Sequence, residues 1–243
     1  MTKSQLQTTK AVLFLDFDGT LTRRDAVDVI LETYADAKWL TLEEKWRAGR
    51  IGSRDCLRAQ MALVRATRPQ IDALLDEIEI DPGLVTLLEM CASQEILTHI
   101  VSDGFDYCIR RILSRAGLTA SALLRGGRVC AGRLETRGHL WRTEFPYFHQ
   151  TCGHGCATCK PAVMRLLNPT NALTIFVGDG LSDRYAVESA DLVFAKNQLA
   201  DHCREQSIAH ISYRDLSDVA GQLDRWLAAG MFKLEQEKKR VSA

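Results

Sequence analysis

Short, strongly apolar segments recur along the chain, separated by longer stretches whose apolar residues have helical spacing. The apolar segments are rich in β-branched residues, which predicts strands buried on both faces of a sheet. These strands are expected over residues 11–17, 96–101, 172–177, 191–195 and 208–211. Helices are expected between them, over residues 83–92, 105–116, 161–167, 182–190 and 216–227. This alternation predicts an α/β fold with a doubly wound, Rossmann-like parallel sheet.

The alternation is interrupted twice. Residues 23–80 contain four helical segments and no buried-strand pattern, and Leu57, Met61 and Val64 recur there at helical spacing. We therefore predict a small helical cap over residues 23–80, inserted after the first strand, with the core formed by residues 1–22 and 81–243. The second interruption, residues 123–148, is strand-like and contains a predicted turn at Gly126-Gly127.

The overall charge narrows the classes of partner. The 31 Lys and Arg residues balance 31 Asp and Glu residues, so the formal net charge is zero. A basic nucleic-acid binder or a polybasic membrane-surface protein is therefore not expected. The hydrophobic content of 46% and charged content of 26% are those of a globular protein.

The location is predicted from the first ten residues and from the cysteines. The sequence begins with a polar stretch that lacks an apolar signal region. Eight cysteines in a chain without an export signal are expected to be reduced thiols rather than disulfides. We therefore expect a cytoplasmic protein, and the sequence leaves monomer and homodimer equally open.

Three of the predicted strands end in polar, glycine-containing segments. The first runs into Asp16 and Asp18, the second into Ser102, and the third into Asp179. Because the carboxyl ends of parallel strands collect at one edge of a sheet, these side chains are expected to form one site.

The carboxylates at these strand ends suggest a cation site. Asp16 and Asp18 alternate along an extended segment, so both side chains can lie on one side of it. Asp179 and Asp183 add two more carboxylates. Oxygen ligands of this kind suit Mg²⁺, which leaves coordination positions for phosphate and water. A lone Asp more often caps a helix or forms a turn, but coincidence at several strand ends favours the site.

Four motifs together resemble the haloacid dehalogenase superfamily, in its phosphatase branch (subfamily IB). The first is DFDGTLT at residues 16–22, the second is Ser102, the third is Lys160, and the fourth is GDGLSD at residues 178–183. They occur in the order that this superfamily shows, and the helical insertion stands where that branch has its cap.

The resemblance implies an enzyme, a phosphoric monoester hydrolase acting on a small phosphorylated metabolite. It implies that Asp16 attacks phosphorus to form an aspartyl-phosphate and that Asp18 acts as general acid and then base. Mg²⁺ is implied on Asp16, Asp18 and Asp179, with the Asp18 contact made by its main-chain carbonyl. The residues implied in phosphate binding are Ser102, Asp103 and Lys160, and those implied in support are Gly19, Thr20 and Asp183.

A cluster of cysteine and histidine residues immediately precedes Lys160. It contains His149, Cys152, His154, Cys156 and Cys159. Cys152, His154, Cys156 and Cys159 are ligand types that suit a structural Zn²⁺, although their spacing is shorter than in a zinc finger. The alternative is a tight loop in which the thiols only pack.

This cluster, with CKPAVMRLL at residues 159–167 and FAKNQLADHCREQ at residues 194–206, resembles the methionine-salvage branch of the family. Its members remove phosphate from 2-hydroxy-3-keto-5-methylthiopentenyl-1-phosphate. Phosphoserine phosphatase is a poorer match, because Asp25 replaces a longer acidic residue and Gln60 replaces the Arg that binds the substrate carboxylate. A pyridoxal-phosphate phosphatase, a phosphomutase and a phosphatase-like zinc-binding regulatory protein remain as alternatives.

Overall fold

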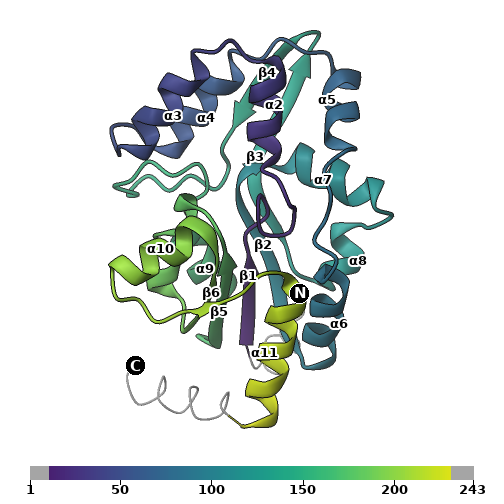
Figure 1. Ribbon diagram of the computed structural model, residues 1–243, viewed down its shortest axis with the longest axis vertical. Helices are drawn as coiled ribbons and strands as arrows, with labels where there is room; N and C mark the ends of the chain where they lie inside the picture. The colour runs from purple at the N-terminus through teal and green to yellow at the C-terminus, as the bar shows by residue number, and fades with distance from the viewer. Residues whose placement is uncertain (1–10, 231–243) are drawn as a thin grey trace.

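The computed structural model describes residues 11–230, so the outer ends of the predicted core, residues 1–10 and 231–243, lie outside the described residues. Its centre is a seven-stranded sheet with the order β4-β3-β2-β1-β5-β6-β7 (Figure 1). All neighbouring strands are parallel except β3 and β4. The strands are β1 (Ala11–Leu15), β2 (Ile96–Phe105), β3 (Val129–Arg137), β4 (Leu140–Glu144), β5 (Leu173–Gly178), β6 (Leu192–Ala195) and β7 (Ile211–Ser212).

Helices cover both faces of this sheet, so the predicted doubly wound α/β fold is confirmed. Alternate residues of β1 belong to two different apolar cores: Leu13 packs in one and Phe14 in the other. The first core includes residues of α6 (Leu84–Ser93), α7 (Asp106–Arg115) and α11 (Leu216–Ala228). The second includes residues of α9 (Lys160–Leu167) and α10 (Asn197–Glu205). β1 is apolar throughout because both of its faces are buried.

Two predicted elements differ from the structure. Residues 182–190 form two short 3₁₀ turns, Leu181–Asp183 and Val187–Ser189, instead of one helix. The reason is local, because the Asp183 carboxylate accepts hydrogen bonds from the main-chain N–H groups of Asp179 and Gly180 and fixes a tight turn. The last predicted strand begins at Ile211, three residues later than expected.

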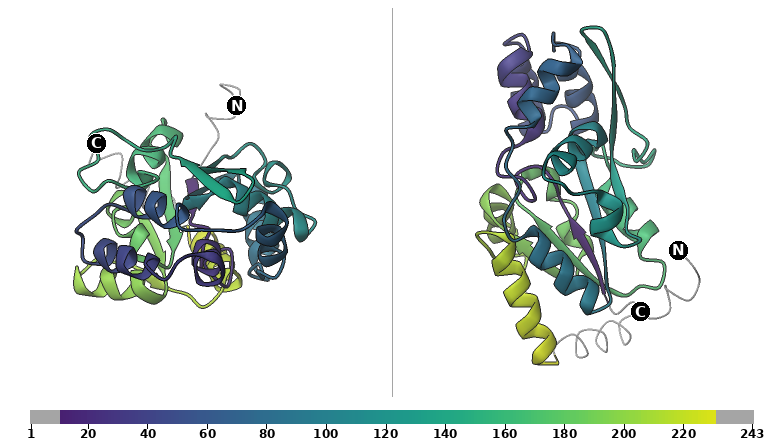
Figure 2. Two further views of the ribbon diagram at one scale, coloured as in Figure 1. Left: turned by 90° about the horizontal axis from the view of Figure 1, so that it is seen from above. Right: turned by 90° about the vertical axis from the view of Figure 1, so that its right-hand side faces the viewer.

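Four helices fill the segment between β1 and α6. They are α2 (Ala26–Tyr34), α3 (Trp39–Arg47), α4 (Ser53–Met61) and α5 (Arg68–Leu75). Figures 1 and 2 show them gathered at one end of the molecule, beyond the carboxyl end of β1. Asp25 caps α2, since its carboxylate accepts hydrogen bonds from the N–H groups of Val27 and Asp28.

A hairpin of the sheet reaches the same end of the molecule. Residues 123–148, predicted to be strand-like, contain the short helix α8 (Ala120–Leu124) only at their start and then strands β3 and β4. The Trp141 indole on β4 donates a hydrogen bond of 2.9 Å to the main-chain carbonyl of Ala66 in the helical segment. The hairpin therefore links the four helices to the sheet.

The structure also shows the state of the cysteines and the length and character of the helices. All eight cysteines of the sequence are free, as expected for reduced thiols. Among the described residues, we find no helix with the length and apolar character needed to cross a membrane.

Candidate active site

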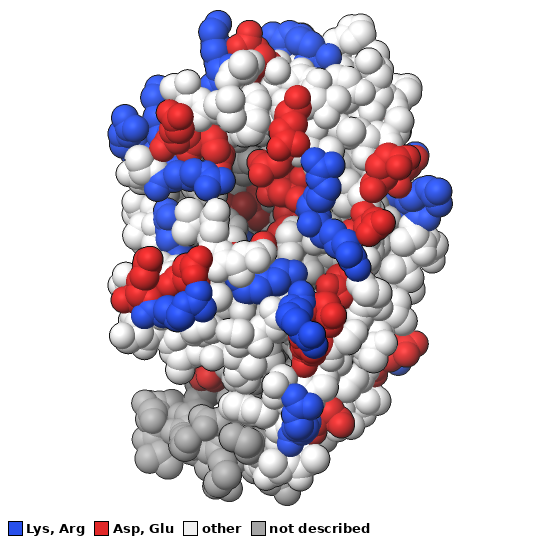
Figure 3. All heavy atoms as spheres, in the orientation of Figure 1, with Lys and Arg blue, Asp and Glu red and all other residues white. Residues whose placement is uncertain are grey.

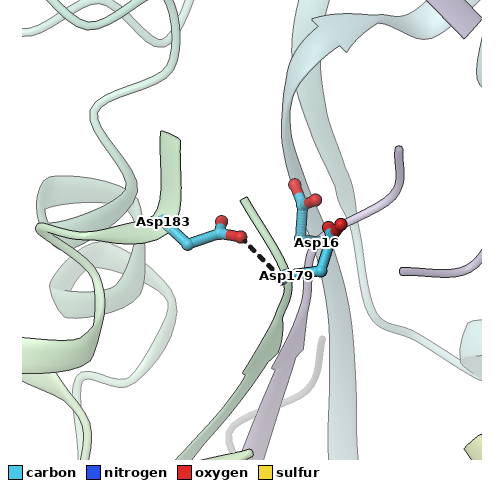
Figure 4. Close-up of side chains that lie close together, drawn as sticks. All are labelled: Asp16, Asp179 and Asp183. Atoms are coloured by element: carbon cyan, nitrogen blue, oxygen red, sulfur yellow. Dashed lines mark hydrogen bonds between the residues drawn. The ribbon is translucent and has the colours of Figure 1, made fainter. Parts of the chain in front are cut away.

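The predicted strand-end residues meet at one edge of the sheet. β1 pairs with β5 in parallel register, with Leu15 beside Val177, so Asp16 and Asp179 follow two neighbouring strands. One carboxylate oxygen each from Asp16, Asp179 and Asp183 lies within 4.8 Å of the others, and Figure 4 shows these side chains around one point. Gly19 permits this approach, because it has φ +73° and a Cβ there would lie 2.5 Å from the Asp179 carboxylate.

Lys160 joins this carboxylate group from the start of α9. Its ammonium lies 2.7 Å from Asp16 and 2.5 Å from Asp183, and the side chain is 1% exposed. Burial lowers the pKa of Lys160, but the charges of Asp16, Asp183 and Asp103 outweigh it and raise that pKa above its ordinary value. Lys160 is therefore a cation that is held in place by two buried carboxylates.

The carboxylate group suits a hard divalent cation. Burial and the charge of Asp183 raise the pKa of Asp16 well above its ordinary value, and the same causes raise that of Asp179 to about 6. Both Asp183 oxygens already accept hydrogen bonds, from Lys160 and from main-chain N–H groups. Asp16 and Asp179 are therefore the better ligands, and Asp183 orients Lys160.

Asp18 lies two residues beyond Asp16 in the chain and contacts Ser102 of β2. Ser102 donates a hydrogen bond of 3.3 Å to Asp18 and accepts one of 2.9 Å from the Gly104 N–H. The other Asp18 oxygen accepts from the N–H of Ala26, the first residue of α2. Burial and the charge of Asp25 raise the pKa of Asp18 well above its ordinary value, which favours the protonated form that a general acid needs.

Asp103, predicted to bind phosphate, uses its carboxylate for contacts within the protein. It accepts hydrogen bonds from the Ser53 hydroxyl (2.5 Å) and from the Thr158 N–H (3.2 Å). A carboxylate also repels a phosphate dianion. The Asp103 side chain therefore connects α4 to the loop before α9.

A cavity of about 350 Å³ opens beside these residues. It is lined on the sheet side by Asp16, Asp18, Ser102 and Asp179, and on the helical side by residues of α2, α3 and α4. Figure 3 shows the opening as a hollow with acidic side chains along its rim. Most of the residues predicted to carry the chemistry therefore face this cavity, whereas Lys160 and Asp183 lie behind Asp16, outside its lining.

The helical wall of the cavity is acidic. Asp25, Asp28 and Glu43 all line it. Burial raises the pKa of Asp28 to about 7, with further contributions from Asp25 and Glu43. Gln60 donates a hydrogen bond of 3.1 Å to Glu43, and Arg47 pairs with Glu43 at 2.9 Å. The Glu43 carboxylate is therefore already bound to the Gln60 amide and to the Arg47 guanidinium.

The cysteine and histidine loop does not support the predicted zinc site. Within residues 11–230, the three aspartates form the one group of metal-ligand types whose atoms all lie within 4.8 Å of one another. The His154 ring instead stacks on Tyr185, with ring centroids 3.7 Å apart. The other members of the predicted zinc set are Cys152, Cys156 and Cys159. No three of the four predicted ligands, all of them described residues, have their ligand atoms within 4.8 Å of one another.

Two site residues were not predicted. Asn197 donates a hydrogen bond of 3.3 Å to Asp179, and it follows the carboxyl end of β6, so the strand-end argument could have found it. Ser53 touches Asp103 and also accepts from the Ala157 N–H at 2.9 Å. Nothing in the sequence around Ser53 marks it, because it stands at the start of an ordinary helix.

The protein is thus an α/β protein with a group of carboxylates at the carboxyl ends of its central strands, and Asp16 follows the first of these strands. A family model for haloacid dehalogenase-like hydrolases matches residues 13–188, more than half of the 243 residues. The chain belongs to that family. The resemblance and the hydrolase class predicted from the motifs are thus confirmed.

Two relatives that carry the same name are similar to this chain over most of its length. A phosphatase for 2-hydroxy-3-keto-5-methylthiopentenyl-1-phosphate from Brevibacillus brevis is 28% identical over 212 residues, covering 86% of this chain and 93% of the relative. One of the same name from Bacillus pumilus is 26% identical over 219 residues, covering 89% and 92%. The names of these relatives support the prediction that the protein is a phosphoric monoester hydrolase.

Solved phosphoserine phosphatases share the fold. One that carries a phospho-aspartyl intermediate analogue has a TM-score of 0.66 at 19% identity, over 88% of this chain and 99% of that one. A substrate-bound complex has a TM-score of 0.65 at 19% identity, over 88% and 98%. At this identity the likeness shows the architecture alone.

Proposed function

We propose that the protein is a Mg²⁺-dependent phosphomonoesterase that acts through an aspartyl-phosphate on Asp16. The observation that carries this proposal is the position of Asp16, which follows β1, contacts the Lys160 ammonium at 2.7 Å and lines the cavity. Residues 23–80 are proposed to act as the cap of this site, on a core formed by residues 1–22 and 81–243. The substrate is a small phosphorylated metabolite in the cytoplasm.

Asp16 is the proposed nucleophile. A carboxylate oxygen forms a bond to phosphorus while the bond to the leaving alcohol breaks. The transferred group is surrounded by Lys160, by Ser102 and by the main chain of residues 103–104. These groups offset the charge of its oxygens. Asp183 holds Lys160 through the contact at 2.5 Å, so the ammonium needs little reorganisation.

Asp18 is the proposed acid and base. In the first step its carboxyl proton passes to the leaving oxygen, and in the second step the carboxylate takes a proton from the water that attacks the aspartyl-phosphate. Its raised pKa suits the first role. The contact with the Ala26 N–H keeps the carboxyl group at the boundary between the sheet and α2.

Asp16 and Asp179, with the Asp18 carbonyl, are the proposed ligands of Mg²⁺. When bound, a divalent cation supplies positive charge that lets a phosphate dianion approach two carboxylates. Thr20 and Asn197 orient the Asp179 carboxylate through hydrogen bonds of 3.1 and 3.3 Å.

Removal of divalent cations tests this assignment. Protein treated with a chelator is expected to release no phosphate from an aryl phosphate until Mg²⁺ is restored. Because the pKa of Asp179 is about 6, protons compete with the cation below that pH, and the Mg²⁺ concentration needed for half-activation should rise by about tenfold per unit of pH. Titrations of activity with Mg²⁺ at several pH values measure this. Full activity in the chelator, or half-activation independent of pH between 5 and 7, contradicts the assignment.

The acidic cavity wall supports a substrate whose leaving group carries no carboxylate. We propose 2-hydroxy-3-keto-5-methylthiopentenyl-1-phosphate, on which the named relatives act, because Val27, Trp46 and Leu57 also give the wall apolar surface. Phosphoserine is disfavoured, since its carboxylate would face Asp25, Asp28 and Glu43. The two guanidinium groups at the cavity are already paired, Arg47 with Glu43 and Arg23 with Glu79.

A comparison of substrates tests this selectivity. The catalytic efficiency kcat/KM for the methionine-salvage substrate is expected to exceed that for phosphoserine by at least about 100-fold, with pyridoxal phosphate as a third substrate. Asp28→Asn removes one repelling charge and should narrow the difference at pH 8, whereas Glu77→Gln, an exposed change in the same segment, should not. A preference for phosphoserine would overturn the substrate and leave the phosphatase chemistry standing.

Two alternatives are separated by simple measurements. A phosphomutase would return the phosphoryl group to an organic product, so stoichiometric inorganic phosphate excludes it. A zinc-binding regulatory protein would be inactive with Mg²⁺ on every phosphate ester while holding one zinc per chain. Asp16, Asp18 and Asp179 all line one cavity, and Lys160 contacts Asp16; this intact set favours the enzyme.

A further inference from the structure

Two cysteine thiols contact a third, that of Cys152, in the loop that leads into α9. The thiols of Cys156 and Cys159 both make hydrogen-bond contact with Cys152. Cys156 and Cys159 are buried, whereas Cys152 is partly exposed. One thiol that solvent can reach therefore faces two enclosed thiols, and the proposed reaction uses none of them.

The surroundings of Cys152 favour a negative sulfur. The main-chain N–H groups of Cys156 and His154 donate hydrogen bonds to it, in addition to the two thiols. Burial acts in the opposite direction, but these donors outweigh it and lower the pKa of Cys152 below that of an ordinary thiol. Burial raises the pKa of Cys156 and of Cys159. The loop thus pairs one nucleophilic sulfur with two protonated thiols.

We propose that Cys152 is a modification site for hydroperoxides, and that Cys156 or Cys159 captures the oxidised sulfur as a disulfide within the loop. The Cys152 thiolate attacks one peroxide oxygen, the O–O bond breaks, and the other oxygen leaves as water or an alcohol after taking a proton. The resulting sulfenic acid is attacked by the neighbouring thiol; a sulfur–sulfur bond forms, and the hydroxyl leaves as water with that thiol's proton. The two sulfurs lose two electrons and the peroxide gains them.

The position of the loop connects this change to the active site. The Cys159 N–H donates to the Tyr147 carbonyl at 3.0 Å, and Cys159 directly precedes Lys160. The N–H groups of Ala157 and Thr158 bind Ser53 and Asp103. A disulfide that tightens residues 152–159 displaces these groups, and a shift of Lys160 by about 1 Å is expected to lower phosphatase activity on the order of 10- to 100-fold.

Peptide mass after peroxide treatment tests the site directly. The full chain, freed of reductant, is treated with hydrogen peroxide and digested with trypsin, which leaves all three cysteines on the peptide of residues 143–165. This peptide is expected to lose two hydrogen atoms, and a phosphine reductant should restore both its mass and the activity. Serine at both Cys156 and Cys159 should leave a sulfenic acid on Cys152 that dimedone traps.

Matched single variants identify the reactive sulfur. Cys152→Ser should abolish the mass change and the peroxide sensitivity while keeping the basal activity. Cys203→Ser, at a buried cysteine of α10, should behave as the unaltered protein. A peptide that keeps its free thiols, or a Cys152→Ser variant that is inactivated like the unaltered protein, overturns the proposal. The activity readout rests on the proposed function, but the peptide mass does not, so failure of one is distinguishable from failure of the other.

Discussion

Asp16→Asn is expected to lower kcat by roughly 10³- to 10⁵-fold, since an amide cannot form the aspartyl-phosphate. The side chain keeps nearly the same volume, and Asp16 is 4% exposed at the end of the central strand, so the fold should persist. The Lys160 ammonium can still donate to the amide oxygen, which occupies the position of the oxygen it contacts at 2.7 Å. The measurement is steady-state release of inorganic phosphate from the methionine-salvage substrate and from an aryl phosphate.

Two controls make this result specific to the nucleophile. Asp224→Asn makes the same chemical change at an exposed position of α11 and should leave kcat unaltered. Circular dichroism and the unfolding midpoint in urea should show that Asp16→Asn remains folded. Full turnover by Asp16→Asn would refute the covalent mechanism and the choice of Asp16 together.

Lys160→Met is expected to affect both activity and stability. Loss of a fixed cation beside the transferred phosphoryl group should lower kcat/KM by about 10²- to 10³-fold. The same change leaves the buried carboxylates of Asp16 and Asp183 without their ammonium, and breaking a buried ion pair in this way costs about 3–5 kcal/mol of the free energy of unfolding. Phosphate release and urea unfolding measure the two effects.

The stability loss in Lys160→Met has a definite pH dependence. Lys160 lowers the pKa of Asp16 through its charge and its hydrogen bond, so without the ammonium that pKa is expected to rise further above its unfolded value. Carboxyl groups of that kind bind protons more tightly in the folded protein, so they recover stability as pH falls through the folded pKa. The difference between the two proteins should therefore shrink at acidic pH.

A methionine at an exposed lysine provides the matched control. Lys45→Met in α3 should change neither the activity nor the free energy of unfolding beyond about 0.5 kcal/mol. If Lys160→Met were as stable and as active as this control, Lys160 would neither stabilise the buried carboxylates nor take part in phosphate binding.

The meeting of Asp16 and Asp179 could be predicted from the sequence, because it depends on the course of the main chain. Asp16 and Asp179 follow adjacent parallel strands, and their meeting depends only on the order of those strands in the sheet. The strands themselves were predictable because a strand buried on both faces must be apolar at nearly every position. The strands β1, β5 and β6 could therefore be predicted to within a few residues.

The contacts between the helical segment and the core could not be predicted. Ser53 meets Asp103, and Gly52 meets Gly155, only because α4 packs against the loop before α9. A Cβ on Gly52 would lie 2.3 Å from the Gly155 carbonyl oxygen, yet a single sequence shows only two ordinary glycines. Such pairings depend on how two separate segments dock, which hydrophobic periodicity does not encode. The hydrogen bond between Gln60 of α4 and Glu43 of α3 likewise depends on how two helices pack.

The order of strands in the sheet also determines when this site can form during synthesis. β1 is the first strand of the described chain, yet it lies at the centre of the sheet, between β2 and β5. One of its edges therefore has no partner until the ribosome has made residue 178. An unpaired, wholly apolar strand invites pairing with other chains, so the nascent protein passes through an aggregation-prone stage. Asp16 and Asp179 meet only after that stage, which makes the proposed catalytic centre a late product of folding.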